Sequence, residues 1–243
     1  MSENLCNEKI CLVTGSGGGL GKAIAESFLN AGAKVVLIDK NAARLSECFT
    51  RLLSAHPDRV LALEVDITDE ASVQKMIIDA VEKLGKLDVL VNNAGIMDHF
   101  DPVGDLESTL WDRVIAVNLT APMLTLKAAV KQMLSQEKPG GVILNVGSTS
   151  SLKEFCAGAA YTASKHGLIG LTKNTATYYA KKGIRCVAIL PAGMRTNAYR
   201  TVVKSSAFKP PMVETNKAAK VCLHLCLDNA EYMNGACVPI DDG

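Results

Sequence analysis

The chain has 243 residues, of which 48% are hydrophobic and 21% are charged, and its formal net charge is +1. That length can bury a full core as one large α/β domain or two small ones. Because no run of like charges occurs, the composition indicates neither a nucleic-acid surface nor a polybasic membrane patch. No apolar run approaches the roughly 18 residues that a membrane helix needs, so we predict no membrane partner and no nucleic-acid partner.

The amino-terminal segment and the cysteines bear on location. Residues 1–9 contain no basic segment followed by an apolar one, so no secretory signal is predicted. The eight cysteines are scattered without a C-x-x-C pair, and we expect reduced thiols and a cytoplasmic protein. Cys222 and Cys226 would share one helix face while His224 points elsewhere, which favours buried small residues over a metal site. We therefore predict no metal.

Short β-branched runs alternate with longer helix-period stretches along the chain. In order, strands are predicted at residues 10–15, 34–39, 59–66, 87–95, 140–148, 184–193 and 236–241. Between them, helices are predicted at residues 21–32, 41–55, 69–85, about 108–136, about 160–182 and about 214–228. Several strands are nearly continuous apolar runs, as in a parallel sheet buried on both faces. Residues 1–243 are therefore predicted to form one doubly wound α/β domain of the Rossmann type.

Residues 194–213 show the weakest pattern, and the pair Pro210-Pro211 prevents a helix there. A long loop in a compact domain is often a lid or a binding loop. We therefore predict that this segment is the substrate loop, with plain disorder as the alternative.

A glycine-rich turn, TGSGGGLG at residues 14–21, joins the first predicted strand to the first helix. Glycines let the backbone approach a phosphate closely, and the amino end of a helix offers free N–H groups and positive partial charge. The strand-turn-helix context favours a dinucleotide site over a simple turn. The predicted cofactor contacts in this turn are Gly15, Ser16, Gly17, Gly18, Gly19, Leu20 and Gly21.

Asp39 ends the second predicted strand, where a carboxylate can accept hydrogen bonds from both hydroxyls of an adenosine ribose. It would repel a 2′-phosphate, and no arginine or lysine lies between Gly15 and Gly21 to bind one. NAD is therefore favoured over NADP. Lys40 counts against strict preference, because it follows Asp39 directly.

Further motifs stand in a fixed order along the chain. They are NNAG at 92–95, Asn118 within VIAVNLTAP, Ser148 thirteen residues before Tyr161, YTASK at 161–165 and PAGMRT at 191–196. Together with the glycine turn they resemble the short-chain dehydrogenase/reductase family, from about residue 9 to residue 243. Two departures occur: Ala192 precedes Gly193 where the family commonly has Pro-Gly, and Gly147 stands where a second serine is frequent.

The resemblance implies a fold and a catalytic set. The fold is a seven-stranded, mostly parallel sheet in the order 3-2-1-4-5-6-7, with helices on both faces. Tyr161 would transfer a proton to or from the substrate oxygen, and Ser148 would polarise the carbonyl. Lys165 would hold the nicotinamide ribose and lower the tyrosine pKa. Asn118 would continue a proton path to solvent through a main-chain distortion and a water.

The resemblance also implies further cofactor contacts and an assembly. Asp66 and Ile67 would flank the adenine, and Asn93 would line the adenosine side. Met194 and Thr196 would contact the nicotinamide carboxamide. The family suggests a homotetramer.

Magnitudes support Tyr161 over the neighbouring hydroxyls. A tyrosine base near neutral pH needs about 4 kcal/mol of preference for phenolate, and a lysine ammonium about 4 Å away supplies about that much. An i, i+4 pair such as Tyr161 and Lys165 shares one helix face. SSLK at 150–153 fits a serine-nucleophile motif, but its partner motifs and the G-x-S-x-G elbow are absent from the sequence.

We therefore predict an NAD(H)-dependent oxidoreductase that interconverts a secondary alcohol and a ketone. One alternative is an NADPH-dependent carbonyl reductase of the 3-oxoacyl-thioester type, and another is a dinucleotide-binding regulator without turnover. The substrate stays open among sterols, polyols, acyl groups and small ketones. Its pocket is expected at 96–103, 149–158 and 194–213, with the walls formed by Ile96, Met97, Asp98, His99, Phe100, Leu152, Lys153, Glu154, Phe155, Cys156, Arg195 and Tyr199.

Overall fold

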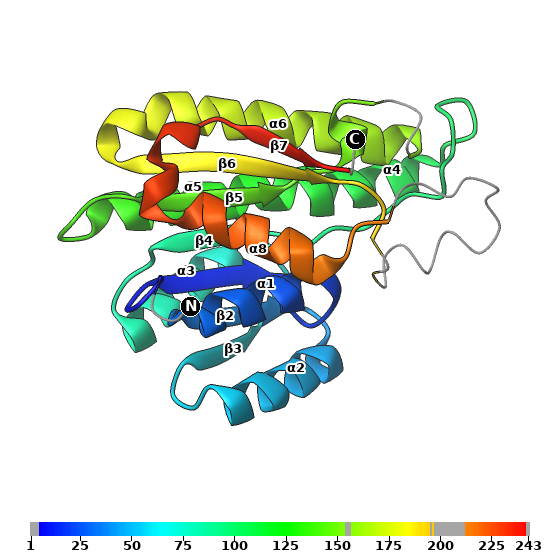
Figure 1. Ribbon diagram of the computed structural model, residues 1–243. Coiled ribbons are helices and arrows are strands. Elements are labelled where there is room, and N and C mark those ends of the chain that lie inside the picture. The colour runs from blue at the N-terminus through cyan, green and yellow to red at the C-terminus, as the bar shows by residue number, and fades with distance from the viewer. Residues whose placement is uncertain (1–4, 154–156, 195, 197–211, 242–243) are drawn as a thin grey trace.

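The computed structural model describes residues 5–153, 157–194, 196 and 212–241. Within these residues the strands form one seven-stranded sheet in the order β3-β2-β1-β4-β5-β6-β7 (Figure 1). The strands are β1 (Ile10–Thr14), β2 (Lys34–Asp39), β3 (Val60–Glu64), β4 (Val89–Asn92), β5 (Gly141–Val146), β6 (Ile184–Pro191) and β7 (Cys237–Ile240). Every strand pairing in this sheet is parallel, so the predicted order is confirmed and the sheet is more uniform than "mostly parallel".

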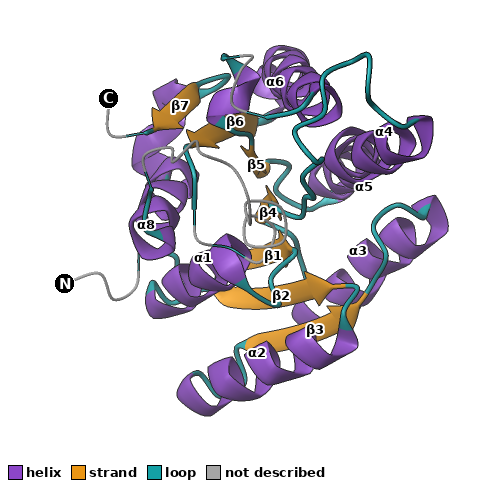
Figure 2. Ribbon diagram, turned by 90° about the vertical axis from the view of Figure 1, so that its right-hand side faces the viewer, coloured by secondary structure: helices purple, strands orange, loops and turns teal. Residues whose placement is uncertain are grey.

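Helices cover both faces of the sheet (Figure 2). The helix bounds are α1 (Gly19–Asn30), α2 (Ala42–Ala55), α3 (Glu70–Leu84), α4 (Ser108–Ile115), α5 (Ala121–Ser135), α6 (Ala159–Tyr179) and α8 (Thr215–Cys226). Shorter turns are η1 (Ala116–Thr120), η2 (Thr149–Ser151), η3 (Ala180–Lys182) and η4 (Asp228–Met233). Helices α1, α2 and α8 lie on one face, and α3 to α6 lie on the other.

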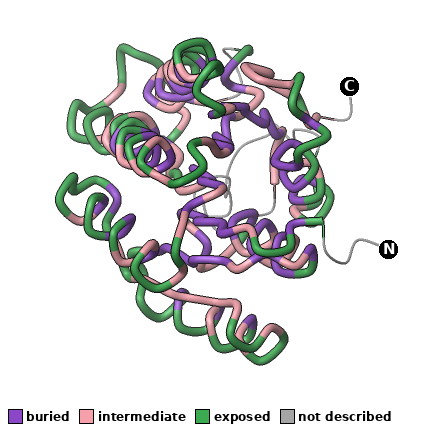
Figure 3. Tube along the Cα trace, turned by 90° about the vertical axis from the view of Figure 1, so that its left-hand side faces the viewer, coloured by how far each residue is buried: buried purple, intermediate pink, exposed green. Residues whose placement is uncertain are grey.

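The hydrophobic core is divided by the sheet into two clusters. Along β2, Val35 and Leu37 join the cluster under α1 and α8, whereas Val36 and Ile38 join the cluster under α3 and α5. Both faces of the central strands are therefore buried, as Figure 3 shows, and this accounts for their continuous apolar sequences. Cys222 and Cys226 of α8 are buried in the first cluster.

The helix predicted at about 108–136 is interrupted by a wider turn. Helix α4 continues into the π-helical turn η1, and η1 continues into α5. In the described chain this is the one helix that is long and apolar enough to cross a membrane by length and composition. Half of its most apolar window is buried inside the protein, where α5 packs on α3 and α4 packs on α6, so it is a core helix.

A buried chain of polar side chains crosses the middle of the sheet. The Asn92 amide donates to Asn145 Oδ1 at 3.0 Å, and the Asn145 amide donates to Thr172 Oγ1 at 2.9 Å. Thr125 Oγ1 lies 2.6 Å from Asn92 Oδ1. All four side chains are buried, so helices α5 and α6 are held to the central strands by satisfied hydrogen bonds.

Replacing the centre of this chain should destabilise the fold. Asn145→Ala leaves the Asn92 amide and the Thr172 hydroxyl without their partner, so we expect the free energy of unfolding to fall by about 3 kcal/mol. Urea unfolding followed by circular dichroism measures this loss. Asn174→Ala, at an exposed position of α6, is the matched control and should change stability by less than about 0.5 kcal/mol. Equal stability of the two variants would contradict the assigned role.

Candidate functional site

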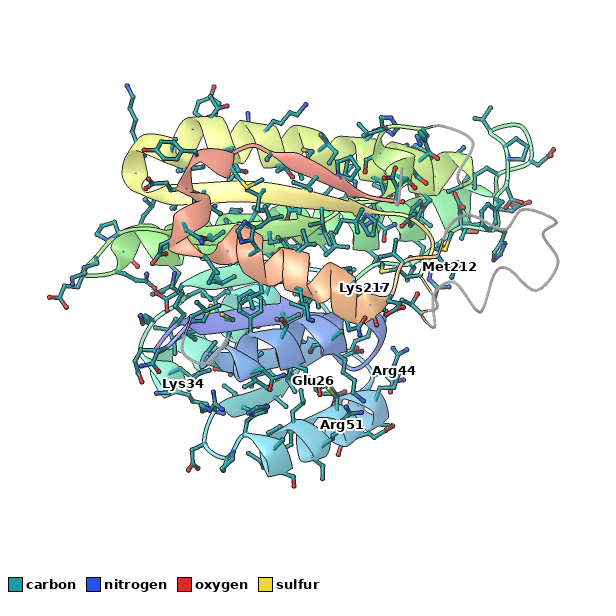
Figure 4. The ribbon with its side chains drawn as sticks, viewed as in Figure 1. Glu26, Lys34, Arg44, Arg51, Met212 and Lys217 are labelled. Atoms are coloured by element: carbon teal, nitrogen blue, oxygen red, sulfur yellow. The ribbon has the colours of Figure 1, made fainter. Side chains whose placement is uncertain are left out.

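A cavity opens at the carboxyl ends of the strands, where β1 and β4 lie side by side. These ends face the viewer in Figure 2 and lie at the right of Figure 1. Figure 4 shows Arg44 and Met212 at the same end, and Lys34, which begins β2, at the opposite end. In an open parallel sheet, neighbouring strands whose helices leave to opposite faces create a crevice for a ligand at this position.

The glycine turn is shaped by close backbone approaches. Gly15 has φ +64°, and a Cβ there would lie 2.8 Å from the Ala94 main chain. A Cβ at Gly21 would collide with the Gly15 carbonyl oxygen and lie 2.5 Å from the Asn93 amide nitrogen. That amide donates to the carbonyl oxygens of Thr14 and Gly15 at 2.9 and 3.1 Å. Asn93 therefore ties the turn to the end of β4, and it also lines the cavity, as predicted.

The predicted turn residues divide into two groups. Those that line the cavity are Gly15, Gly18, Gly19 and Leu20. Ser16, Gly17 and Gly21 lie outside its wall. Ser16 is buried and accepts a hydrogen bond from the Ile38 N–H at 2.8 Å, so it joins the turn to β2.

Asp39 stands at one end of the cavity. Its carboxylate accepts hydrogen bonds from the N–H groups of Gly17, at 3.1 Å, and Asn41, at 2.9 Å. Arg44, in the first turn of α2, lies 3.5 Å from the same carboxylate and also lines the cavity. The sequence prediction missed Arg44, because only the direction in which α2 leaves β2 brings it beside Asp39.

The neighbouring wall comes from the segment after β3. Asp66, Ile67 and Thr68 line the cavity, as predicted for the first two. Asp66 accepts hydrogen bonds from the Thr68 N–H and hydroxyl at 3.0 and 2.7 Å, and these bonds lower the pKa of its carboxyl. Lys40 lies 3.7 Å from Asp66 and also lines the cavity, so a cation and a carboxylate are paired at the cavity edge.

Ser148, Tyr161 and Lys165 meet at the other end of the cavity, and all three line it. Ser148 follows β5 and is held by two bonds of η2: its Oγ accepts from the Ser150 N–H, and its N–H donates to Ser151 Oγ. Tyr161 and Lys165 share one face of α6, with Lys165 Nζ 5.5 Å from the centre of the tyrosine ring. The ammonium donates to the Val146 carbonyl oxygen at 2.8 Å. The structure thus brings together the three side chains that the motifs predicted.

The electrostatics of this end differ from the prediction. Burial raises the pKa of Tyr161 to about 12, a hydrogen bond with the Ser148 hydroxyl opposes the rise, and the Asp98 carboxylate adds to it. Burial also lowers the pKa of Lys165 to about 8. The sequence predicts that Lys165 lowers the tyrosine pKa, but among the protein's own groups the desolvation of the phenol is the largest cause of the shift, and the pKa is raised.

Asn118 lies behind the cavity wall within η1. Its side chain accepts from the Ile96 N–H at 2.9 Å and donates to the Ile96 carbonyl oxygen at 2.8 Å. A Cβ at Gly95 would lie 3.3 Å from Asn118 Oδ1 and 3.7 Å from Lys165 Nζ. The glycine therefore leaves both groups room beside the main chain at this position. The main-chain distortion predicted at Asn118 is present as the π-helical turn η1, and the Asn118 side chain holds the segment that follows β4.

Met194 and Thr196 also line the cavity. A Cβ at Gly19 would lie 3.2 Å from the Thr196 methyl group, which places this segment against the glycine turn. The Val213 N–H donates to the Gly193 carbonyl oxygen at 2.8 Å, so the two ends of the predicted substrate loop are held together. The rest of that loop, 195 and 197–211, lies outside the described residues.

The predicted pocket walls are confirmed in part. Ile96, Met97 and Phe100 line the cavity. Asp98 does not line it, because its carboxylate is fully buried beneath the start of α6. His99, Leu152 and Lys153 are exposed and do not line the cavity either. Glu154, Phe155, Cys156, Arg195 and Tyr199 lie outside the described residues.

Gly147, where the family frequently has a second serine, lies close to its neighbours. A Cβ at this position would lie 2.6 Å from a methyl group of Leu190 and 3.1 Å from Ser151 Oγ. The space that a second serine would need is therefore filled by β6 and η2. The glycine leaves the Ser148 position unchanged at the end of β5.

Comparisons with known proteins agree with this geometry. A family model described as short chain dehydrogenase matches residues 9–207. The chain is 43% identical to the short chain dehydrogenase/reductase dpchG of Colletotrichum higginsianum, over 97% of this chain and 93% of that protein. It is 36% identical to 3beta-hydroxysteroid dehydrogenase 2 of Eggerthella lenta, over 96% and 93%. It resembles the crystal structure of 3-ketoacyl-(acyl-carrier-protein) reductase from Brucella melitensis complexed with NADH, with a TM-score of 0.90, 30% identity and 98% coverage of both chains.

The buried Lys165 should cost stability. Burial lowers the pKa of this ammonium from 10.5 to about 8, which reduces the free energy of unfolding at pH 7 by about 3 kcal/mol. Lys165→Met removes this cost but leaves the Val146 carbonyl oxygen without its donor, which costs about 1–2 kcal/mol. We therefore expect the variant to be about 1–2 kcal/mol more stable than the wild type at pH 7, measured by urea unfolding.

The pH dependence gives this prediction a second test. Between pH 8 and 10.5 the unfolded wild-type chain binds more protons than the folded one, so wild-type stability rises with pH in that window. The advantage of Lys165→Met should shrink accordingly. Lys173→Met, at an exposed position of α6, is the control. Its difference in stability from the wild type should stay the same across this pH range. A constant difference between wild type and Lys165→Met would contradict the account.

Proposed function

Because the chain belongs to the short-chain dehydrogenase/reductase family, a family of oxidoreductases, we propose that it interconverts a secondary alcohol and a ketone with NAD(H). The observation that carries the proposal is the convergence of Ser148, Tyr161 and Lys165 on the cavity that the glycine turn also lines. Any one of these motifs alone is weak, whereas their meeting in one cavity is what hydride transfer with acid/base catalysis requires.

The residues present fit a nicotinamide dinucleotide. The glycine turn leaves room that side chains would fill, at the amino end of α1, where a pyrophosphate is favoured. Asp39 would hold the adenosine ribose, and Asp66 and Ile67 would flank the adenine. Met194, Thr196 and Lys165 would hold the nicotinamide end. When bound, the dinucleotide accepts or supplies the hydride.

Side chains of the protein itself would transfer the proton. Tyr161 would remove the proton from an alcohol as phenolate, or donate one to a ketone oxygen as phenol. Ser148, already bonded to the phenol, would donate a hydrogen bond to the same substrate oxygen. Lys165 would hold its ammonium beside this pair. Asn118 is joined to Ile96 and, like Lys165, lies close to Gly95, and it would extend a proton path toward solvent.

NAD is favoured over NADP by the position of Asp39. Its carboxylate points into the end of the cavity that would hold the ribose, and a 2′-phosphate there would meet a negative charge. Arg44 and Lys40 reduce this repulsion because both lie at the same edge. We therefore propose a preference for NAD rather than exclusion of NADP.

An apolar substrate is favoured by the walls around Tyr161. Ile96, Met97, Phe100 and Met194 line the same cavity as Tyr161 and are hydrophobic, so a polyol would leave hydroxyls unpaired against them. The similarity to a 3beta-hydroxysteroid dehydrogenase supports a bulky alicyclic alcohol or ketone. The similarity to a 3-ketoacyl-(acyl-carrier-protein) reductase supports a 3-oxoacyl reductase as the second candidate. That solved structure holds NADH, so the NADPH linkage of this candidate rests on the sequence analysis alone. A homotetramer stays a prediction, as does a cytoplasmic location.

Cofactor titrations separate the two candidates. We expect wild-type protein to bind NADH at least about tenfold more tightly than NADPH, measured by nicotinamide fluorescence. Asp39→Asn keeps the shape of the side chain but removes its charge, so it should bring the dissociation constants for NADH and NADPH closer together. Glu47→Gln, which removes an exposed charge from α2, is the control and should leave the ratio unchanged. A wild-type preference for NADPH of tenfold or more would contradict the proposed cofactor.

Removal of one hydroxyl tests for turnover. Tyr161→Phe should lower kcat for NAD⁺ reduction with secondary alcohols by about 10²- to 10⁴-fold, because it removes the acid/base group. Dissociation constants for NADH should change by less than about twofold, since the ring stays in place. Tyr178→Phe, at an exposed position of the same helix, should keep full activity. Absence of wild-type turnover across a broad alcohol panel would favour the regulator without turnover.

A further inference from the structure

A fully buried carboxylate lies outside the catalytic set. Asp98 belongs to the segment between β4 and α4, and its side chain has no exposed area. The carboxylate accepts three main-chain hydrogen bonds: from Phe100 at 3.2 Å, from Gly158 at 3.0 Å and from Tyr161 at 2.8 Å. A buried charge is costly unless it is satisfied, so these three donors account for its presence there.

Two of the donors belong to the start of α6. Gly158 precedes the first residue of this helix and has no side chain to cap it. Asp98, some sixty residues earlier, supplies the capping oxygens instead, one to Gly158 and the other to Tyr161. A carboxylate at the amino end of a helix also interacts favourably with the helix dipole. The neighbouring Ala159 N–H donates to the Asp101 carbonyl oxygen at 2.9 Å, so two residues of one loop hold this end.

The same carboxylate also holds the part of this loop that lines the cavity. Phe100 adopts φ +65°, a conformation that bulky side chains rarely take, and its N–H donates to Asp98. Phe100 lines the cavity, as does Tyr161. One side chain therefore connects a wall of the pocket with the main chain of the tyrosine. A Cβ at Gly158 would lie 2.6 Å from the carboxylate, so glycine is needed for this approach.

Among the residues that the structure describes, few charges face the Tyr161 phenol. Lys165 lies on its own helix, Ser148 offers a hydroxyl from the end of β5, and Asp98 is the carboxylate that acts on it from the loop after β4. Three further titratable groups in this region are directed elsewhere: His99 and Asp101 lie 3.9 Å from each other, and His166 is exposed on α6. Burial is the largest cause of the raised tyrosine pKa, the Ser148 hydrogen bond opposes it, and Asp98 adds to it.

We propose that Asp98 is a positioning residue for Tyr161: its carboxylate fixes the tyrosine main chain at the start of α6 and keeps a negative charge near the phenol. The proposal rests on the proposed function, since it assigns Asp98 a role in that reaction. Asp98 touches neither substrate nor cofactor in this account. It acts through the position of Tyr161 and through the ionisation of its phenol.

Two variants separate the geometry from the charge. Asp98→Asn keeps the shape, but one carboxylate oxygen becomes an amide that cannot accept, so at least one of the three N–H groups loses its partner. It also removes the charge. Gly158→Ala keeps the charge but pushes the carboxylate away from α6. Asp105→Asn, which neutralises an exposed acid of the same loop, is the matched control. Thermal melting establishes that each variant is folded.

The kinetic experiment is the pH profile of kcat for alcohol oxidation. We expect kcat to fall about tenfold or more in Asp98→Asn and in Gly158→Ala, with the KM for NAD⁺ changed less than about twofold. Oxidation needs the phenolate, so activity rises with pH through the apparent pKa of Tyr161. Loss of the Asp98 charge should move that rise to lower pH by about 0.5–1 unit in Asp98→Asn, and by less in Gly158→Ala. An unmoved rise in Asp98→Asn would overturn the proposal even if kcat falls.

Hydrogen exchange tests, without any measurement of turnover, whether the Asp98 carboxylate holds the start of α6. Amide protons in a peptide covering 157–165 should exchange faster in Asp98→Asn and Gly158→Ala than in the wild type, and Asp105→Asn should match the wild type. Equal exchange in all four proteins would overturn the proposal. Absence of wild-type turnover across the alcohol panel would count against the proposed function, whereas the exchange result would still decide whether Asp98 holds Tyr161.

Discussion

The buried ammonium of Lys165 is the constraint on which the rest of the site depends. This residue is only 4% exposed, and its ammonium donates to the Val146 carbonyl oxygen at the end of β5. Such a charge is unfavourable on its own, and burial already lowers the pKa of the group to about 8. It can persist only if α6 is held firmly against the sheet. The hydrogen-bonded chain through Asn145 and Thr172 supplies that attachment.

Segments far apart in sequence are joined around this charge by side chains that bond to main chain. Asn118 holds Ile96, Asn93 holds the glycine turn, and Asp98 holds the start of α6. Each of these side chains is polar and at least partly buried, and each satisfies backbone groups that a loop would otherwise expose to water. The loops at the carboxyl edge of the sheet are therefore joined to one another by hydrogen bonds. This is the rigidity that a site for proton and hydride transfer needs.

The parts of the fold that the sequence predicts are those set by local pattern. Strands such as β2 are apolar on both faces, so their bounds follow from the apolar run alone. The glycine turn and the i, i+4 pair of Tyr161 and Lys165 are likewise local. The interruption of the long helix at Asn118 was predicted through the family resemblance, because nothing in the apolar period of residues 108–136 marks it.

The parts that could not be predicted depend on contacts across the chain. Asp98 was expected on a pocket wall, but its partners lie some sixty residues later, and they bury it. Arg44 was missed because its proximity to Asp39 depends on the angle at which α2 leaves the sheet. The raised pKa of the tyrosine in the protein alone was also missed, because the sequence reasoning considered nearby positive charge and omitted desolvation of the phenol.

Burial raises the pKa of Tyr161 in the protein, and we expect the positive charge of bound NAD⁺ to bring it back toward the working pH. Tyrosinate absorbance near 295 nm, taken as the difference between wild type and Tyr161→Phe, measures this directly. No phenolate from Tyr161 is expected at pH 9 in protein alone, and phenolate should appear when NAD⁺ is added. A phenolate signal already present at pH 9 without NAD⁺, or no change on adding saturating NAD⁺, would contradict this expectation.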